Sequence, residues 1–268
     1  MKLVNVGCGA VYHPAWINLD AAPSAPEVKR SDARDGLPFP DASVDAVYHS
    51  HMLEHLDAAS ARAFLRECHR VLRPGGVLRV VVPDLEGIAQ AYLCELGSAK
   101  AGGDRTLYEW CRMELTDQAA RTRSGGAMEP FLHNLSAAQV AIVRTRAGKE
   151  VEAHVTADGA RSRWRRATPA KIWLHLRRKI VEVFAWLLGG SWMSAALNEG
   201  WFRQSGEVHR VMYDRLSLAQ LLVDSGFAEP KKVIAGESAI PDYAEYGLDA
   251  IDGVIRKPDS LFMEAIRR

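Results

Sequence analysis

Short runs of apolar residues, each closed by glycine or a polar residue, recur through the first third of the chain. The runs at 3–6, 44–50 and 77–84 are rich in β-branched residues, which favours strands that are buried on both faces of a sheet. Apolar residues at helical spacing fill 59–72, and a second helix is expected over 85–96. Strand and helix in alternation predict a parallel sheet with right-handed crossovers.

A different pattern begins at Gly97, where 97–206 is expected to form a largely helical insertion that serves as an acceptor cap or as an oligomer or membrane contact. Helices are expected near 106–121, from Ser136 and over 171–188, and the α/β pattern resumes with a helix at 216–225 and strands near 231–235 and 260–266. We therefore predict an α/β fold in a single domain over 1–268. It is a Rossmann-like, doubly wound, mostly parallel seven-stranded sheet with the insertion between strands 5 and 6.

Composition and the spacing of the cysteines indicate the cellular compartment of the protein. Apolar residues make up 48% and charged residues 25% of the chain, as in ordinary soluble globular proteins. The four cysteines form no CxxC pair, which predicts a reduced, cytoplasmic protein. The sequence begins directly with a strand, so no secretory leader is expected.

Charge is distributed unevenly. Residues 144–179 hold eleven Lys and Arg against three acids, an excess of +8, so the remainder carries about −7 of the formal net charge of +1. This basic segment indicates either an anionic partner or a solvated face. Nucleic acid is not expected as a partner, because no recognisable RNA-binding module accompanies the segment.

The most apolar tract, 180–190, is too short for a membrane-spanning helix and carries Glu182. The default interpretation of 171–190 is a core helix or the packing face of a homodimer. The alternative is an interfacial helix in peripheral contact with a membrane, with Arg177, Arg178 and Lys179 near anionic head groups.

Glycine and acidic residues follow the expected strands, where parallel sheets bind their ligands. Gly7 and Gly9 follow the first strand, and glycine lets the backbone approach a ligand closely. Asp20 ends the second strand and Asp32 the third; an acid at the end of the second strand can accept hydrogen bonds from ribose hydroxyls. Tyr12 replaces the third glycine of a dinucleotide motif, so the expected ligand is a nucleoside without a pyrophosphate.

Several motifs stand in the order found in one enzyme family: VNVGCG, Asp20, the LPF turn, VDAVYHSHMLEHL and RVLRPGGVLRVVVPD. With these motifs the chain resembles class I S-adenosylmethionine-dependent methyltransferases of the type 11 group, which occur in bacterial polysaccharide and natural-product gene clusters. The resemblance covers Met1 to about Tyr92. Weaker matches are RTRSGGAM, HRVMYDRLSLAQLLVDSGF and KPDSLFMEAIR.

The resemblance implies S-adenosylmethionine as the cofactor. It assigns the methionine part to Val6, Gly7, Cys8 and Gly9, the ribose hydroxyls to Asp20, the adenine to Asp32 and Ala33, and the sulfonium to Ser50 and His51. One departure from the family is that only 12 residues separate Gly7 from Asp20. The first helix of the fold is therefore expected to be minimal, and Trp16 is expected to pack over the cofactor in its place.

The expected reaction is O-methylation of a sugar, a glycan or another hydroxylated small molecule. Methyl transfer from a sulfonium is an in-line displacement in which the enzyme mainly aligns donor and acceptor. A hydroxyl acceptor also needs a base, and histidine suits that role near neutral pH. We expect one of His51, His133 and His209 to be the base, and Asp84 after the fifth strand is a further candidate.

Other interpretations stay open. The chain could be a non-catalytic accessory protein that binds through its basic insertion, the donor could be a carboxylated S-adenosylmethionine, and the methylated atom could be a nitrogen or a carboxylate oxygen. His51, Glu54 and His55 also match the zinc motif HxxEH. No third ligand is apparent from the sequence, so no metal is expected.

Overall fold

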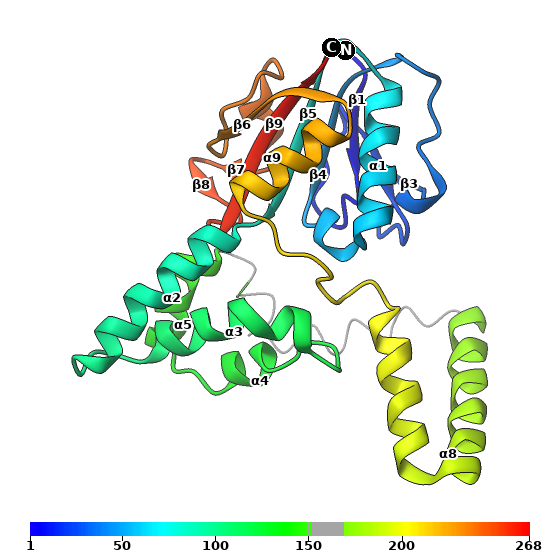
Figure 1. Cartoon of the computed structure of the whole chain (residues 1–268), viewed down its shortest axis with the longest axis vertical. Helices are drawn as coiled ribbons and strands as arrows, with labels where there is room; N and C mark the ends of the chain where they lie inside the picture. The colour runs from blue at the N-terminus through cyan, green and yellow to red at the C-terminus, as the bar shows by residue number, and fades with distance from the viewer. Residues whose placement is uncertain (149–150, 152–168) are drawn as a thin grey trace. The chain divides into compact units, whose positions relative to one another are not determined.

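The computed structural model describes residues 1–148, 151 and 169–268, so most of the predicted basic segment lies outside the described residues. The chain forms two compact units (Figure 1). The first consists of Met1–Gly103 and His209–Arg268, and the second of Asp104–Val208.

The first unit is built on a seven-stranded sheet. Its strands are β1 (Leu3–Val6), β2 (Ile17–Asp20), β3 (Val28–Arg30), β4 (Val44–Ser50), β5 (Leu72–Pro83), β6 (Phe227–Val233) and β9 (Ser260–Arg267). Their order is β3-β2-β1-β4-β5-β9-β6. The first five strands are parallel, and β9 is antiparallel to both β5 and β6. The predicted mostly parallel sheet is therefore confirmed, as is the helical insertion after the fifth strand.

The strand β5 begins at Leu72, whereas the sequence predicted a strand only from 77. The RPGG sequence at 73–76 is part of the strand and not a break between the helix and the strand. The pairing of β5 with β4 shifts there: Val44 lies opposite Leu72, whereas Ala46 lies opposite Val77. Gly75, with a φ of 78°, takes a left-handed conformation inside this irregularity. The extra residues are accommodated as a bulge, and the strand then runs straight to the candidate site.

Two helices, α1 (Ala58–Val71) and α9 (Arg215–Asp224), cover one face of the sheet (Figure 1). Each begins at an aspartate, Asp57 or Asp214, whose carboxylate accepts two backbone N–H groups of the first turn. Their buried side chains pack with the strands in one cluster, and the helical members include Phe64, Leu65, Cys68, Leu218 and Leu222.

Aromatic side chains form the core on the other face of the sheet. Trp16 is buried there, with its ring edge-on to those of Tyr48, Tyr243 and Tyr246. Tyr243 and Tyr246 bound the 3-10 helix η3 (Tyr243–Tyr246). Trp16 is thus a core side chain, and its expected role as a cover over the cofactor gains no support.

A buried ion network lies within this aromatic core. The Arg79 guanidinium is fully buried and bonds Asp249 at 2.7–2.8 Å and Glu264 at 2.8 Å. The hydroxyls of Tyr48 and Tyr243 donate to the same Asp249 carboxylate at 2.7 and 2.8 Å. Buried charge is tolerated only when it is paired and hydrogen-bonded, and here it ties β5 to the C-terminal segments of the unit.

The connections of the first unit hold the remaining short elements. Between β1 and β2 the chain forms turns without a helix, which confirms the prediction of a minimal first helix. α2 (Leu85–Lys100) follows β5 and extends the predicted helix by one turn. The sequence did not predict the 3-10 helices of this unit, among them η1 (Ala33–Asp35), or the two short strands β7 (Ala250–Ile251) and β8 (Val254–Ile255), which pair with each other.

The second unit is helical in the residues described. α3 (Thr106–Ala120), α4 (Met128–His133) and α5 (Ala137–Ala147) pack around a small apolar cluster that includes Trp110, Leu132 and Val143. α8 (Pro169–Arg203) contains two non-helical residues, Gly189 and Gly190, at which it folds back on itself (Figure 1). The helix predicted over 171–188 is therefore the first arm of a helical hairpin.

Candidate functional site

The glycine turn after β1 is folded tightly against its neighbours. The N–H groups of Gly7 and Cys8 both donate to the carbonyl of Leu19, at 2.8 and 3.1 Å. Gly7 and Gly9 have φ angles of 66° and 54°. A Cβ on Gly7 would lie 2.8 Å from Cγ of Met52, whereas a Cβ on Gly9 would meet nothing within 4 Å. Gly7 therefore brings the turn against the segment after β4, and Gly9 leaves open space for a ligand.

Asp20 closes β2 beside this turn. Its carboxylate accepts the N–H of Gly9 at 2.8 Å and the N–H of Ala22 at 2.7 Å. A carboxylate offers about four acceptor positions, so two remain for hydroxyl donors. Burial, and the nearby Asp20 charge, raise the pKa of the Cys8 thiol to about 11, so this thiol is neutral and suits packing rather than nucleophilic attack.

A pocket of about 590 Å³ lies beyond the ends of β2 and β3, and its lining includes Ala21, Ser31, Asp32 and Leu37. Asp32 caps η1, accepting the backbone N–H of Arg34 at 3.0 Å and pairing with the guanidinium of that residue at 2.6 Å. Hydrogen bonding to Arg34 lowers the pKa of Asp32. Of the two residues assigned to adenine, Asp32 borders this pocket and Ala33 packs against the core.

The segment after β4 turns sharply. The chain forms the short 3-10 helix η2 (Leu53–His55) there, and α1 starts only at Ala58. His51 takes a left-handed conformation with a φ of 50°, which is uncommon for residues other than glycine and often marks a functional site. Ser50 still pairs with Val81 of β5, and the N–H of His51 donates to the carbonyl of Val81 at 2.9 Å, so the turn begins directly at the end of the ladder.

His51 lies between two groups. Its Nε2 is 2.8 Å from the hydroxyl oxygen of Ser260, and its Nδ1 is 3.4 Å from Oε1 of Glu54. The Glu54 side chain is fully buried, and neither of its oxygens makes a hydrogen bond to a described residue. Burial raises the pKa of Glu54 to about 8, and burial, with a smaller effect of Lys257, lowers the pKa of His51. Near neutral pH the imidazole is therefore uncharged.

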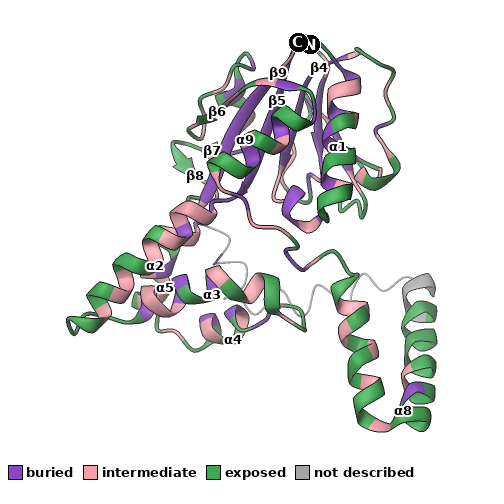
Figure 2. Cartoon of the chain, in the orientation of Figure 1, coloured by how far each residue is buried: buried purple, intermediate pink, exposed green. Residues whose placement is uncertain are grey.

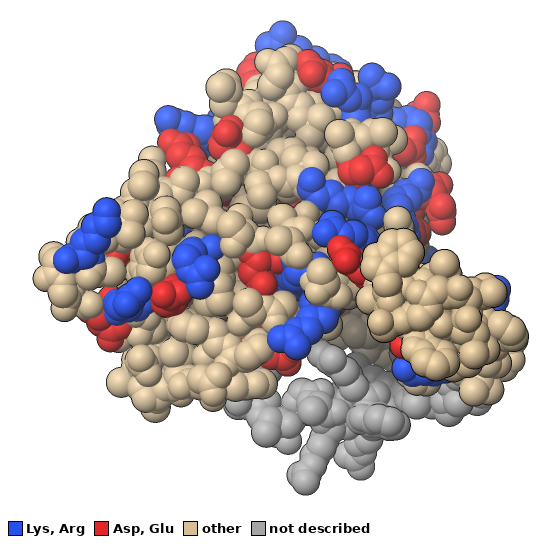
Figure 3. Space-filling model, turned by 60° about the horizontal axis from the view of Figure 1, so that its bottom comes forward, with Lys and Arg blue, Asp and Glu red and all other residues tan. Residues whose placement is uncertain are grey.

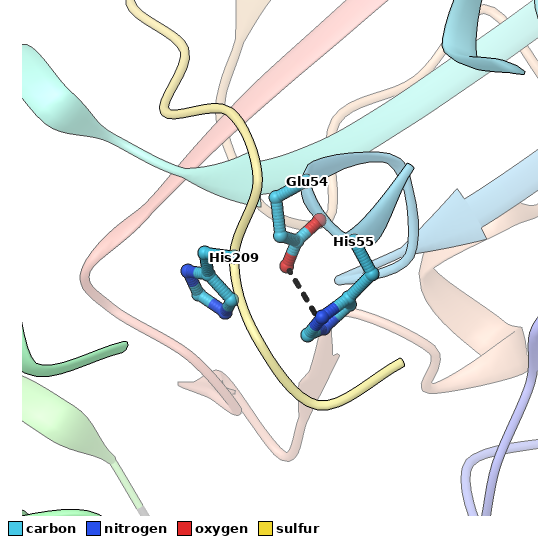
Figure 4. A group of neighbouring side chains, drawn as sticks. All are labelled: Glu54, His55 and His209. Carbon is cyan, nitrogen blue, oxygen red and sulfur yellow. Dashed lines mark ion pairs between the residues drawn. The ribbon is translucent and has the colours of Figure 1, made fainter. Parts of the chain in front are cut away.

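His209 joins the same cluster from the far end of the insertion. The N–H groups of Arg210 and Val211 donate to the backbone carbonyl of Glu54 at 2.7 and 3.3 Å. This pairing brings the His209 ring to 4.8 Å from that of His55, between ring centres, with Glu54 beside both (Figure 4). The structure thus brings together two of the three candidate histidines, His51 and His209.

The other two candidates have different surroundings. His133 is the last residue of α4, in the second unit. Asp84 caps α2: one carboxylate oxygen accepts the N–H of Gly87 at 3.2 Å, and the other pairs with Lys232 at 3.1 Å. Both oxygens of Asp84 are therefore engaged in fixing the helix and the neighbouring strand, which suits a positioning role.

Glu54 and His55 were not among the site residues chosen from the sequence. With His209 they form a group of potential metal ligands whose donor atoms lie within 4.8 Å of one another. The HxxEH motif indicated two of them, but the third comes from a distant segment that no local spacing reveals. Donors on one zinc ion lie about 3.4 Å apart, so these side chains would have to move closer to bind a cation.

A family model described as "Methyltransferase domain" matches residues 4–80. The matched segment contains the glycine turn, Asp20, Asp32 and the His51–Glu54 turn. The residues fit the cofactor of this family, because Gly9 leaves an open cradle and Asp20 retains acceptor positions. Over residues 4–80 the chain is thus similar to methyltransferase domains.

Two curated relatives share parts of this region. A probable S-adenosylmethionine-dependent methyltransferase of Mycolicibacterium smegmatis is 52% identical over 60 residues, which are 20% of this chain and 22% of that protein. A protein of the same description from Mycobacterium tuberculosis is 53% identical over 49 residues, 18% of this chain and 17% of that protein. The matches thus span about a fifth of the length of these curated relatives.

Solved structures align over nearly the whole chain. One is a methyltransferase of Thermotoga maritima described as a possible histamine N-methyltransferase, with 13% identity, a TM-score of 0.40, and coverage of 100% of this chain and 82% of that one. Another, a methyltransferase of Archaeoglobus fulgidus, has 12% identity, a TM-score of 0.40, and coverage of 99% and 86%.

Proposed function

We propose that the protein is an S-adenosylmethionine-dependent O-methyltransferase that acts on a hydroxyl group of a sugar, a glycan or another hydroxylated small molecule. The observation that carries the proposal is the family match of residues 4–80, since that segment contains both the cofactor turn and the His51–Glu54 pair. The free thiols of Cys8, Cys68, Cys94 and Cys111 are consistent with a reducing compartment, the cytoplasm.

The residues around the glycine turn would hold the donor. Gly7 and Gly9 let the backbone lie close to the methionine part, and Asp20 would accept hydrogen bonds from the ribose hydroxyls. Asp32, at the edge of its pocket, would lie beside the adenine. When bound, the donor supplies a methyl group on a positively charged sulfur. The protein's task is then to align an acceptor with that methyl group.

His51 would act as the general base. Glu54 Oε1 lies 3.4 Å from its Nδ1, and the Ser260 hydroxyl lies 2.8 Å from its Nε2. An acceptor hydroxyl that took the place of the Ser260 hydroxyl would be within hydrogen-bond reach of Nε2. The acceptor oxygen forms the new C–O bond as the C–S bond of the donor breaks, and the hydroxyl proton passes to Nε2 of His51.

The contact between Gly7 and Met52 supports the combination of these two sites. Because a Cβ on Gly7 would collide with the Met52 side chain, the cofactor turn and the His51–Glu54 turn are in direct contact. A base on the second turn is therefore close to the end of the first. The insertion at 97–206 would then select the acceptor.

The test uses methyl-labelled S-adenosylmethionine with the full chain and a fractionated pool of glycans and small hydroxylated metabolites from its host. The expected product carries label that resists mild alkali, because an ether is stable where a methyl ester is hydrolysed. Label that is released by mild alkali would indicate carboxylate methylation, and label on an amine would indicate N-methylation. Either result would contradict the proposed O-methylation while leaving the donor assignment intact.

A further inference from the structure

The hairpin formed by α8 is held together by contacts between its two arms. At its closed end Gly190 has a φ of 68°, a conformation that favours glycine. Farther from this end, the Asn198 amide donates to the Glu182 carboxylate at 3.0 Å, and the Arg178 guanidinium lies 5.6 Å from the centre of the Trp201 ring. The two arms are therefore antiparallel along much of their length.

Large apolar side chains on this hairpin are exposed. Leu188 is 81% exposed and Trp192 is 75% exposed, and most of the hairpin is drawn as exposed in Figure 2. The other exposed large apolar residues of the hairpin are Trp173, Leu174, Leu176, Ile180, Val181, Val183, Phe184, Trp186, Leu187 and Met193. Soluble proteins rarely expose a continuous apolar surface of this kind unless it meets a partner or a membrane.

The exposed residues do not form a single stripe. Positions 183, 184, 186, 187 and 188 are all exposed and apolar, and at 100° per residue they spread over about 200° of the circumference of the first arm. A helix that packs against one protein surface needs an apolar stripe only about 100° wide, and this arc is about twice that width. The distribution therefore favours lipid over a second protein surface.

Charge is separated along the hairpin. From 183 to 198, around the closed end, the sequence contains no Asp, Glu, Lys or Arg. The open end carries Arg177, Arg178, Lys179 and Arg203, with Glu182 paired to Lys179 at 2.8 Å. Figure 3 shows the hairpin surface as predominantly neutral, with a few charged side chains at its margin. An apolar end below a ring of cations matches the profile of an anionic lipid leaflet.

The length of the arms defines how deep the hairpin can reach. Among the described residues, Trp173–Arg203 is the one helix long and apolar enough, by length and composition, to cross a membrane. The reversal at Gly189 and Gly190 divides it, so the arm from Trp173 to Leu188 is only about 24 Å long, against about 30 Å for a hydrocarbon core. We propose that the α8 hairpin inserts its closed end into one leaflet of an anionic membrane, with its cations at the head groups.

The test is sedimentation of the full-length protein with vesicles of phosphatidylcholine alone and of equal parts phosphatidylcholine and phosphatidylglycerol. The protein is expected to sediment with the anionic vesicles, and Leu188→Glu and Trp192→Glu should each weaken binding at least about tenfold, because they bring a charge into the lipid. The matched control is Leu216→Glu on α9, where Leu216 is 77% exposed in the first unit. It should bind as the unaltered protein does.

A fluorescence measurement distinguishes insertion from contact with head groups alone. Brominated lipid should quench the tryptophan emission of the bound protein, and Trp192→Phe should reduce that quenching. Absence of sedimentation with either vesicle would overturn the proposal, as would equal binding by Leu188→Glu. A dimer in analytical ultracentrifugation that Leu188→Glu dissociates, without vesicle binding, would identify a second copy of the chain as the occupant instead.

Discussion

The two units of the protein depart from the usual distribution of polar and apolar residues in opposite ways. The first unit buries charged and titratable groups, among them Arg79, Glu54 and His49, inside a sheet. The hairpin of the second unit exposes large apolar groups such as Leu188 and Trp192. A buried polar group or an exposed apolar patch is more informative than an ordinary core or surface residue.

The difference between the units lies in how each departure is compensated. Arg79 pairs with the carboxylates of Asp249 and Glu264 in the same unit, so the free-energy cost of burying its charge is offset within that unit. Glu54 has His51 and His55 near one of its oxygens, an arrangement suited to proton transfer. The apolar side chains at the hairpin tip are not covered by other described residues. We therefore expect them to be covered by a membrane or by another molecule. The predictions that follow test each part of this contrast.

The largest effect is expected at the His51–Glu54 pair. His51→Asn should lower the rate of methyl transfer about 10²–10⁴-fold, because a general base typically contributes that much. Affinity for S-adenosylmethionine should change much less than the rate, since the substitution leaves Gly9 and Asp20 in place. Single-turnover rates and calorimetric titration measure the two quantities. His133→Asn serves as the matched histidine control, and a rate equal to that of His51→Asn would reject the assignment of the base.

Arg79→Leu should produce the largest loss of stability. The substitution leaves the carboxylates of Asp249 and Glu264 buried without their cation, and breaking a buried pair in this way costs about 3–5 kcal/mol. Urea unfolding measures the free energy. The exposed pair of Arg215 with Glu86 provides the control, because Arg215→Leu should cost less than about 1 kcal/mol. Similar losses of unfolding free energy in Arg79→Leu and Arg215→Leu would mean that the buried ion pairs contribute no more to stability than the exposed pair.

The buried side chain of His49 should make the free energy of unfolding depend on pH. Its side chain is fully buried, its ring nitrogens make no hydrogen bond to a described residue, and burial lowers its pKa to about 3. Between pH 6.5 and 3 the unfolded chain binds a proton at this residue that the folded chain does not, so the free energy of unfolding falls as pH falls through this range. Each unit of pKa difference corresponds to about 1.4 kcal/mol.

The measurement compares His49→Leu with the unaltered protein in urea titrations from pH 7 to pH 4. The difference in unfolding free energy should shift in favour of His49→Leu by a few kcal/mol over that range. Carboxylates shared by both proteins cancel in the comparison. A difference that does not vary with pH would mean that His49 is not held neutral by burial.

The smallest effect is expected at the tip of the hairpin. Leu188→Glu should change the free energy of unfolding in the absence of lipid by no more than about 0.5 kcal/mol, as is usual for surface substitutions. The reason is that Leu188 is 81% exposed and contributes little to the fold. A loss above about 2 kcal/mol would show that the tip is packed in the free protein, and the contrast between the two units would then disappear.

The central part of the sheet could be predicted because the runs at 3–6, 44–50 and 77–84 are rich in β-branched residues and end at glycine or a polar residue. The run at 77–84 gave no warning of the Arg79 network, because Asp249 and Glu264 are far from Arg79 in the sequence. The two-residue strands β7 and β8 are likewise too short to show a period.

The cofactor residues were accessible to sequence reasoning because they stand directly after strands. Glu54 and His55 were visible in the sequence as part of the HxxEH motif, but their local structure is a 3-10 turn and not the helix that the motif's spacing suggests. The third member of the cluster, His209, is set beside them by the backbone hydrogen bonds from Arg210 and Val211 to Glu54. At the hairpin, the sequence predicted the first arm, but Gly189 and Gly190 were read as its end rather than as a reversal into a second arm.

The central claim is that the turn after β1 and Asp20 bind S-adenosylmethionine. Its most direct test is calorimetric titration of the protein and of Asp20→Asn with S-adenosylmethionine and S-adenosylhomocysteine. We expect saturable binding of both ligands to the protein, and an affinity for both that is lower by about 1–3 kcal/mol in Asp20→Asn, because the ribose hydroxyls lose a charged acceptor. The claim would be contradicted by the absence of binding of either ligand at millimolar concentration, or by equal affinities in the two proteins.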